Sequence, residues 1–262
     1  MPGPVGWIFR NHFHKNRHQT DTADPFCCCG WYFNGNIFCI KWRPALKKYE
    51  HIIWDWNGTL IDDAWLCVEI LNEILNQYDK HPVTLEQYRM DFGFPVKSYY
   101  EHVGFDFNVE SFETIAEEYH AIYDQRCFEC KLQEGVVAVL EGFAGKGLTQ
   151  SVLSACQQKR LEEMIAYYGI GGYFTKLFGL DDHYANGKVE KGLQLLSKLN
   201  ISPENVLLIG DTLHDHEVAE AIGADCVLVP FGHHCLEKLR QMPAIIIDPL
   251  SDALTMPGIP RG

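Results

Sequence analysis

Residues 51–63 of the 262-residue chain read HIIWDWNGTLIDD, an apolar stretch that runs directly into a polar turn. The segment from His51 to Trp54 has the length and composition of a buried β-strand, and Asn57-Gly58-Thr59 has the composition of a turn. Asp55 stands where the strand gives way to the turn. Ligands of open α/β sheets bind beyond the carboxyl ends of the strands, so Asp55 is predicted to face a binding site.

The rest of the chain alternates between apolar strands and amphipathic helices, with one long helical interruption. Four helices are predicted after the first strand, over residues 63–80, 84–90 with Thr84 as N-cap, 96–103 and 110–126. Further strands are predicted at 149–154, 205–210, 225–230 and 244–248, with helices at 135–144, 156–168, 189–199 and 214–222. This pattern predicts a doubly wound parallel α/β sheet with an inserted α-helical cap domain.

The domain boundaries follow from this pattern and from a break in charge. The α/β core is predicted over residues 47–62 and 136–262, and the helical cap over residues 63–135. Residues 1–48 carry seven Lys or Arg against two Asp, whereas residues 49–262 carry 15 basic and 33 acidic residues. Residues 1–46 are therefore predicted to be an atypical leader, disordered or non-native, with a possible Asn-Gly hairpin at 31–38. Translation could start at Leu46; an intact mass that included residues 1–45 would contradict this.

The composition excludes several classes of protein. A formal net charge of −13 would repel nucleic acid, and no uninterrupted apolar stretch reaches the roughly 18–20 residues of a membrane span. Residues 9–24 are polar and rich in histidine, unlike a signal peptide. The ten cysteines are expected to be reduced thiols, because a chain of this size does not need a disulfide framework. We therefore expect a cytoplasmic protein that acts on a small molecule.

Two further segments place reactive side chains at the ends of predicted strands. Ser154-Ala155 closes one strand, and the sequence GDTLHD at 210–215 closes another. Between them, the sequence NGKVEKG carries Lys188 and Lys191. The carboxyl ends of parallel strands share one edge of the sheet, so these residues are predicted to converge near Asp55.

These residue types suit phosphoryl transfer. A carboxylate such as Asp55 attacks phosphorus only when the negative charge of the phosphate is screened. Asp55 and Asp211 could share a Mg²⁺ ion, a hard cation that prefers oxygen ligands, and Asp215 could bind the ion or its waters. The phosphoryl oxygens would meet the hydroxyl of Ser154 or Thr59, backbone N–H groups after Asp55, and a lysine ammonium.

Together, the four segments resemble the ordered motifs of the haloacid dehalogenase (HAD) superfamily, over about residues 49–240. The layout is most similar to phosphoglycolate phosphatase-like members with a helical cap. The resemblance implies a Mg²⁺-dependent phosphohydrolase that acts on a small phosphorylated metabolite through an aspartyl phosphate. It implies that Asp55 is the nucleophile. The metal would be bound by Asp55, Asp211, Asp215 and the backbone carbonyl of Asn57. The phosphate would be contacted by Gly58, Thr59, Ser154, Ala155 and Lys188.

The sequence departs from the superfamily pattern at two positions. Phosphatases of the superfamily usually carry a second Asp, a general acid and base, where this chain has Asn57. Loss of a general acid typically slows a reaction ~10²–10⁴-fold, because it raises the activation free energy by about 3–5 kcal/mol. The enzyme is therefore expected to prefer a leaving group that needs little protonation, to recruit another acid such as His214, or to be slow. The lysine also lacks its usual following proline, so Lys191 rivals Lys188.

Simpler interpretations of some of these residues stay open. Asp211 and Asp215 could merely cap the helix that follows them. Cys127 and Cys130 have a C-x-x-C spacing, but a zinc site would need a second pair of ligands. The histidines and the three adjacent cysteines of the leader, likewise, lack the usual ligand spacing of a metal site.

Two alternative functions also stay open. Lys97 lies with Tyr99 in a Gly/Pro loop of the predicted cap, where both could contact substrate. A phosphonoacetaldehyde hydrolase-like enzyme, which also lacks the second Asp, would use such a cap lysine to form a Schiff base. The chain could instead be a HAD-fold binding protein that lost catalysis when Asn57 replaced Asp. The substrate and the oligomeric state are not disclosed by the sequence.

Overall fold

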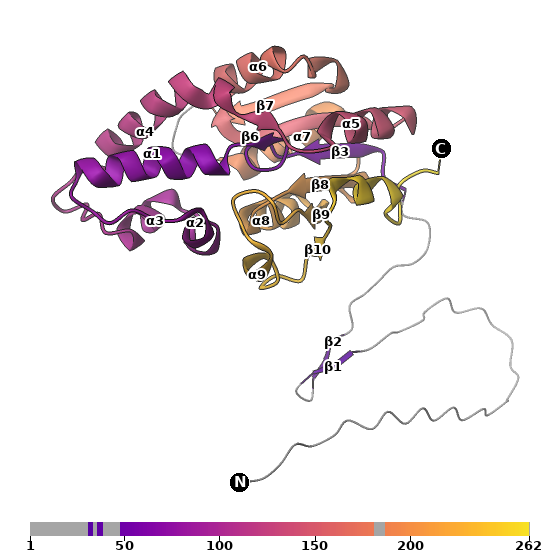
Figure 1. Ribbon diagram of the computed structural model, residues 1–262. Helices are drawn as coiled ribbons and strands as arrows, with labels where there is room; N and C mark the ends of the chain where they lie inside the picture. The colour runs from indigo at the N-terminus through magenta and orange to yellow at the C-terminus, as the bar shows by residue number, and fades with distance from the viewer. Residues whose placement is uncertain (1–30, 34–35, 39–47, 181–186, 262) are drawn as a thin grey trace, which may run out of the picture. The chain divides into compact units, whose positions relative to one another are not determined.

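The computed structural model describes residues 31–33, 36–38, 48–180 and 187–261 (Figure 1). The chain divides into two units, Met1–Pro44 and Ala45–Gly262. In the first unit, strand β1 (Trp31–Phe33) pairs antiparallel with β2 (Asn36–Phe38), as expected for the predicted hairpin. The remaining predictions for the leader, including its disorder and its cysteine- and histidine-rich segment, lie outside the described residues.

The second unit is built on a parallel six-stranded sheet, which confirms the predicted fold class. The strand order is β10-β9-β8-β3-β6-β7, and every neighbouring pair is parallel. The strands are β3 (His51–Trp54), β6 (Thr149–Gln157), β7 (Lys176–Leu180), β8 (Val206–Gly210), β9 (Asp225–Leu228) and β10 (Ile245–Ile246). The central position of β3 places Asp55 between the carboxyl ends of β8 and β6.

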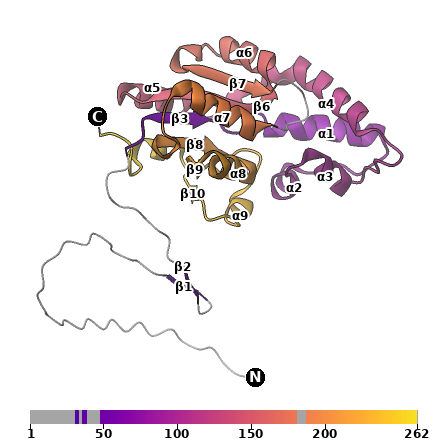
Figure 2. The same ribbon diagram turned by 180° about the vertical axis from the view of Figure 1, so that it is seen from behind.

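Helices cover both faces of this sheet because successive side chains of a strand point to opposite sides. Ile52 and Trp54 belong to one buried cluster, which includes α5 (Val136–Gly145) and α6 (Gln158–Tyr167). Ile53 belongs to a second cluster with α7 (Lys188–Leu199) and α8 (Leu213–Ile222). Figure 2 shows α7 and α8 in front of the sheet, on the face that is hidden in Figure 1.

Four helices between β3 and β6 extend beyond the end of the sheet (Figures 1 and 2). This helical segment consists of α1 (Ala64–Gln77), α2 (Leu85–Asp91), α3 (Val96–His102) and α4 (Phe112–Arg126). As predicted, Thr84 caps α2, and it forms a reciprocal capping box with Gln87. Strands β4 (Ile61–Asp62) and β5 (Lys131–Leu132) pair antiparallel where the chain enters and leaves the segment. The role of this segment as a cap domain stays a prediction.

Several elements were missed by the sequence patterns. Strand β7 reads KLFGL, and a glycine inside a short run argues against a strand. The structure accounts for Gly179, because a Cβ atom there would lie 2.6 Å from the carbonyl oxygen of Cys156. The other elements are short: α9 (Leu236–Leu239), η1 (Cys127–Glu129), η2 (Gly171–Tyr173), η3 (Pro203–Asn205) and η4 (Leu250–Thr255).

Two further observations bear on the composition-based predictions. Among the described residues, no helix combines the length and the apolar character that crossing a membrane would require. The six cysteines in the described part of the chain are free thiols, including Cys127 and Cys130.

Candidate active site

Three buried carboxylates meet at the carboxyl edge of the sheet. Asp55 follows β3, Asp211 follows β8, and Asp215 lies in the first turn of α8. The two strands are direct neighbours, with Trp54 paired to Ile209, so their ends lie side by side. One oxygen from each carboxylate lies within 4.8 Å of the others, and all three residues are buried. The predicted convergence of these residues is therefore present in the structure.

Lys188 supplies the positive charge of this cluster from the first turn of α7. Its Nζ atom lies 2.5 Å from Oδ1 of Asp55 and 2.6 Å from Oδ1 of Asp215. The side chain is 4% exposed, so the charge is held almost out of water. Lys191, its rival in the sequence, is not among the described residues that line the pocket at this edge.

Proton affinities in the cluster reflect burial and like-charge crowding. Burial raises the pKa of Asp55 well above its ordinary value, although the ammonium of Lys188 opposes the shift. Burial also raises the pKa of Asp211, to about 6. Burial would raise the pKa of Asp215 too, but Lys188 and the hydrogen bonds from Thr212 outweigh it and hold the pKa below its ordinary value.

The charges of the cluster fit a divalent cation. Three carboxylates and one ammonium leave a formal charge of −2 in a buried space, and such a charge is unfavourable without a counterion. Carboxylate oxygens are the ligands that Mg²⁺ prefers, and the three oxygens already lie within reach of one ion. Asp55, Asp211 and Asp215 are thus the residues that could hold a metal.

Asp215 also has a simpler structural role. Thr212 is the N-cap of α8, and Oδ2 of Asp215 accepts hydrogen bonds from the backbone N–H and the hydroxyl of Thr212, at 3.0 and 2.6 Å. The capping interpretation of the sequence was therefore correct for Asp215. Oδ1, the other oxygen of Asp215, contacts Lys188. Asp215 therefore stabilises the start of α8 and also belongs to the charge cluster.

Gly58 and Thr59 hold Asp211 in place. The hydroxyl of Thr59 donates a hydrogen bond to Oδ1 of Asp211, at 2.9 Å. Gly58 has a φ of +78°, and a Cβ atom there would lie 2.3 Å from Oδ2 of Asp211. Only glycine fits such a conformation beside a carboxylate without strain. The Thr59 hydroxyl, which the sequence predicted to contact phosphate, is thus bonded to Asp211 instead.

Ser154 and Ala155 lie at the opposite side of Asp55, towards the end of β6. The Ser154 hydroxyl accepts a hydrogen bond from the backbone N–H of Cys156, at 2.9 Å. It lies 3.4 Å from Oδ1 of Asn57, to which it can donate. Ala155 lines the same pocket as Asp55 and Lys188. Ser154 thus lies beside Asn57, and Ala155 lies in the pocket with Asp55 and Lys188.

Asn57 is fixed by a residue that the sequence analysis passed over. Its Nδ2 atom donates to Oδ2 of Asp63, at 2.7 Å, and to the hydroxyl of Tyr123, at 2.8 Å. The other oxygen of Asp63 accepts from the backbone N–H of Gly58, at 2.9 Å. Asp63 precedes α1 but makes no side-chain cap for it. The carboxylate instead holds the turn that follows Asp55.

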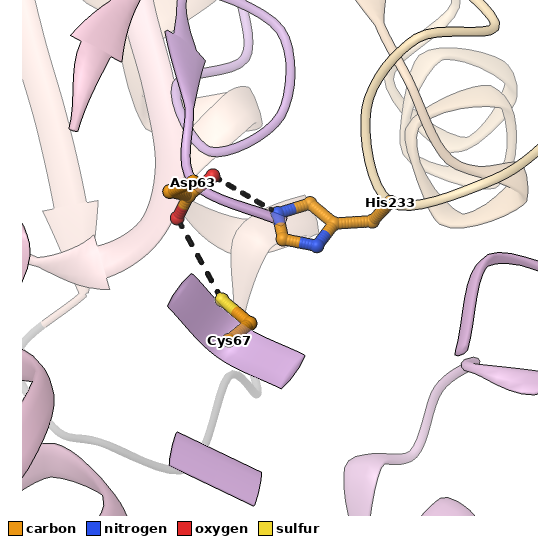
Figure 3. Close-up of side chains that lie close together, drawn as sticks. All are labelled: Asp63, Cys67 and His233. Carbon is orange, nitrogen blue, oxygen red and sulfur yellow. Dashed lines mark hydrogen bonds and ion pairs between the residues drawn. The ribbon is translucent and has the colours of Figure 1, made fainter. Parts of the chain in front are cut away.

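Asp63 is also paired with His233, from the loop after β9 (Figure 3). Nε2 of His233 lies 3.3 Å from Oδ1 of Asp63, and Nδ1 lies 3.0 Å from the hydroxyl of Tyr88. Burial would lower the pKa of His233, but Asp63 outweighs it and raises the pKa to about 9. Burial would raise the pKa of Asp63, and His233 in turn holds it below its ordinary value.

Cys67 completes a second group whose spacing could hold a metal ion, together with Asp63 and His233 (Figure 3). Its Sγ atom lies 3.8 Å from Oδ2 of Asp63. Burial raises the pKa of this thiol. The Asp63 carboxylate already has four partners, and the group is best explained as an anchor for the turn at Asn57.

A pocket with a volume of about 200 Å³ opens onto the carboxylate cluster. Tyr99 lines it, as predicted, and its buried hydroxyl has no hydrogen-bond partner in the described part of the chain. His214 also lines it, with its ring stacked on Phe94 at a centroid distance of 4.6 Å. Lys97 is exposed, and its ammonium lies 5.1 Å from the centroid of the Phe107 ring. The structure does not bring Lys97 to this pocket.

His233 and Asp63 could have been found from the sequence. His233 stands in the segment PFGHH directly after an apolar strand, the same signal that identified Asp55 and Asp211. Asp63 closes the motif HIIWDWNGTLIDD, but it also begins the helix predicted over 63–80, where an acidic residue is common. Tyr123 carried no such signal, because an isolated tyrosine on a helix is more often a core residue.

The chain is similar to several known proteins. The family model of haloacid dehalogenase-like hydrolases matches residues 52–229. A 5'-nucleotidase of Pseudomonas aeruginosa is 24% identical over 200 residues, which cover 76% of this chain and 90% of that protein. A phosphoglycolate phosphatase of the same species is 22% identical over 220 residues, 80% of each chain.

A solved structure shares the fold. A haloacid dehalogenase-like hydrolase from Streptococcus pneumoniae superposes with a TM-score of 0.65 at 19% identity. The match covers 79% of this chain and 98% of that one. The part of the chain that lies before residue 52 is not included in the family match.

Proposed function

The chain belongs to the haloacid dehalogenase-like hydrolases and is a phosphatase of that family, and we propose that it is a Mg²⁺-dependent phosphomonoesterase with Asp55 as nucleophile. The observation that carries this proposal is the contact of Lys188 with both Asp55 and Asp215, next to Asp211. A nucleophile, a cation for the phosphoryl oxygens and a set of hard metal ligands are thereby gathered in one buried space.

The proposed reaction has two steps. An oxygen of Asp55 attacks phosphorus, the bond from phosphorus to the leaving oxygen breaks, and an aspartyl phosphate forms. Water then attacks that phosphorus and releases inorganic phosphate, which restores the Asp55 carboxylate. Lys188 orients the attacking carboxylate and neutralises charge on the phosphoryl oxygens, which is worth most where water is excluded. Bound Mg²⁺ would supply further charge neutralisation.

The remaining site residues would position the two groups. We propose that Asp55, Asp211, Asp215 and the backbone carbonyl of Asn57 hold the metal. Ser154 and the backbone N–H of Ala155 would contact the phosphate, whereas the backbone N–H of Gly58, which the sequence predicted to do so, is bonded to Asp63. The hydroxyl of Thr59 would act through Asp211, to which it is bonded, rather than on the substrate.

The helical segment would act as a cap that selects the substrate and excludes water. Residues 63–135 would form this cap, over a core of residues 47–62 and 136–262. In support, residues of α1, α2, α3 and α4 line the same pocket as Asp55 and Lys188. Tyr99 would contact substrate there, whereas Lys97 lies away from the pocket, which does not favour a Schiff-base mechanism.

The substrate would be a small phosphorylated metabolite, as the names of the relatives suggest. The similar proteins include a 5'-nucleotidase and a phosphoglycolate phosphatase. Release of phosphate from a panel of phosphomonoesters, with and without Mg²⁺, tests the proposal. We expect turnover that requires Mg²⁺ and falls at least ~10³-fold in Asp55→Asn, because an amide is a far weaker nucleophile. Metal binding without turnover of any ester would favour the binding-protein alternative.

A further inference from the structure

The side chain of Asn57 has no N–H left for a substrate. Nδ2 carries two hydrogens, and they are donated to Asp63, at 2.7 Å, and to Tyr123, at 2.8 Å. The hydroxyl of Tyr123 is itself directed at Asp63, at 2.8 Å, so all three groups are locked together. The amide oxygen can only accept a hydrogen bond. Beside the nucleophile, this position therefore offers a leaving oxygen neither a proton nor a hydrogen bond.

Asp63 cannot supply the proton in place of Asn57. Its carboxylate is 0% exposed and accepts hydrogen bonds from Asn57, Tyr123 and the backbone of Gly58. Both carboxylate oxygens are occupied by these donors, so neither is left to meet a leaving oxygen.

His214, the other acid suggested by the sequence, is stacked on Phe94, and its Nδ1 atom lies 3.2 Å from Oε2 of Glu217. With no proton from Asn57 or Asp63, the P–O bond is taken to break with the leaving oxygen still negative. That is feasible for a phenol, with a pKa of about 10, and unfavourable for an aliphatic alcohol, which is nearly as weak an acid as water.

The pocket above this turn has walls suited to such a leaving group. Its lining from the helical segment is mostly apolar or aromatic and includes Leu71, Tyr88, Phe92, Tyr99, Phe112 and Ala116, beside the polar residues Asp63, His120 and Asp124. Several of the rings pack edge to face, as Tyr99 does against Tyr88 and Phe92, at centroid distances of 5.7 and 5.3 Å. Aromatic pairs prefer this geometry, so a further ring is readily accommodated. The volume of about 200 Å³ suits a phosphate with a small leaving group.

From these two independent features we propose that the substrates are phosphate monoesters of phenols, with the aromatic ring held between the helical segment and Asp55. The proposal rests on the proposed phosphatase function and adds the class of leaving group. In the first step, Asp55 displaces a phenolate and becomes phosphorylated. In the second, water yields inorganic phosphate and one proton, which the phenolate takes up.

A pair of matched esters tests the proposal on the intact protein with Mg²⁺. Phenyl phosphate and benzyl phosphate both carry a benzene ring, but only the first releases a phenol. We expect kcat/KM for phenyl phosphate to exceed that for benzyl phosphate by at least ~10²-fold, the lower end of what a general acid contributes. Nearly equal values for the two esters, or faster turnover of nucleoside 5'-phosphates, would overturn the proposal.

Asn57→Asp gives a second, independent test. The new carboxyl group would stand against Asp63, where two carboxylates cannot both ionise and one retains a proton. We expect this variant to raise turnover of benzyl phosphate at least ~10-fold relative to phenyl phosphate, since a general acid helps the poorer leaving group most. An unchanged ratio in a folded variant would count against the role given to Asn57. If the variant does not fold, the comparison in the wild-type protein still decides.

The walls of the pocket are tested by a charge placed on α4. Ala116 lines the pocket, whereas Ala121 lies on the same helix, is exposed and is not a lining residue. Glutamate and alanine both favour helices, so Ala116→Glu and Ala121→Glu are matched in their effect on α4. We expect Ala116→Glu to raise KM for phenyl phosphate at least ~10-fold and Ala121→Glu to leave it within about 2-fold. Equal KM values in both variants would contradict binding of the ring at this wall.

These results separate the proposal from the function on which it rests. If neither phenyl phosphate nor any other monoester is hydrolysed with Mg²⁺, the proposed function itself fails. If benzyl phosphate is hydrolysed as fast as phenyl phosphate, and both require Mg²⁺ and Asp55, the phosphatase stands and the phenolic substrate class is wrong.

Discussion

The Nζ atom of Lys188 lies 2.5 Å from Oδ1 of Asp55, so a buried ammonium is held directly against the proposed nucleophile. Burial would lower the pKa of Lys188, but Asp215 and Asp55 outweigh this effect and raise it. The lysine therefore stays charged, and it compensates carboxylates that would otherwise repel one another. Lys188 is therefore expected to contribute both to the stability of the folded protein and to catalysis.

Lys188→Met is expected to lower the free energy of unfolding by about 3–5 kcal/mol in the absence of metal, because it leaves buried carboxylates without their partner. Urea unfolding measures this change. Added Mg²⁺ should restore part of the stability. Lys159→Met, at a side chain that is 82% exposed, is the control and should have a much smaller effect. Similar losses in both variants would argue that Lys188 has no special place in the cluster.

Magnesium is expected to stabilise the folded protein through the same carboxylates. At 100-fold above its Kd, a ligand that binds only the folded state adds about 2.7 kcal/mol. Asp211→Asn should abolish most of this increment, because it removes one of the three carboxylates. Thermal unfolding of both proteins, with EDTA and with Mg²⁺, measures the difference. An increment that survives in Asp211→Asn would place the metal elsewhere.

Arg89 connects the helical segment to the loop that carries His233. Its Nε and Nη2 atoms donate to the backbone carbonyls of Gly232 and Phe231, both at 2.7 Å. Arg89→Met is expected to reduce stability by about 2 kcal/mol, since hydrogen bonds from charged groups contribute about 1.5–3 kcal/mol each and Arg89 is partly exposed. Amide hydrogen exchange of residues 231–235 should rise.

The exposed Arg240 provides the control for this change. Arg240→Met should leave both stability and exchange near the wild-type values. If Arg89→Met left the exchange of residues 231–235 unchanged, the proposed connection would not be holding the loop.

His51 is expected to make stability fall in acid. It is 0% exposed at the start of β3, its Nδ1 atom lies 2.7 Å from the hydroxyl of Thr149, and burial lowers its pKa to about 4. Because the unfolded chain takes up this proton near pH 6.5, the contribution is complete above that pH and is lost as the pH falls towards 4. The whole shift corresponds to at most ~3 kcal/mol.

His51→Asn removes the titration and keeps a polar group near Thr149. Urea unfolding at several pH values between 7.5 and 4 should show a shallower loss of stability in this variant than in the wild type. All other titrating groups are shared by the two proteins. Parallel pH profiles would mean that His51 does not contribute.

The local pattern of the sequence was enough to predict the parallel fold and most of its elements. Apolar residues recur at different spacings in strands and in helices, so a short stretch such as Ile52 to Trp54 is enough to indicate a strand. Strand β7 was missed because Gly179 interrupts its pattern. The reason for that glycine, close contact with the carbonyl of Cys156, depends on a segment more than twenty residues away.

The sequence by itself determined which segments meet, because the carboxyl ends of neighbouring parallel strands share one edge. Asp55 and Asp211 each follow a strand, and Ser154 lies in the second half of β6. Only the tertiary structure decided which atoms touch. It selected Lys188 over Lys191 as the partner of Asp55, kept Lys97 from the pocket and tied Asn57 to Asp63. Such choices depend on differences of a few ångströms between side chains from distant parts of the chain, and no local periodicity encodes them.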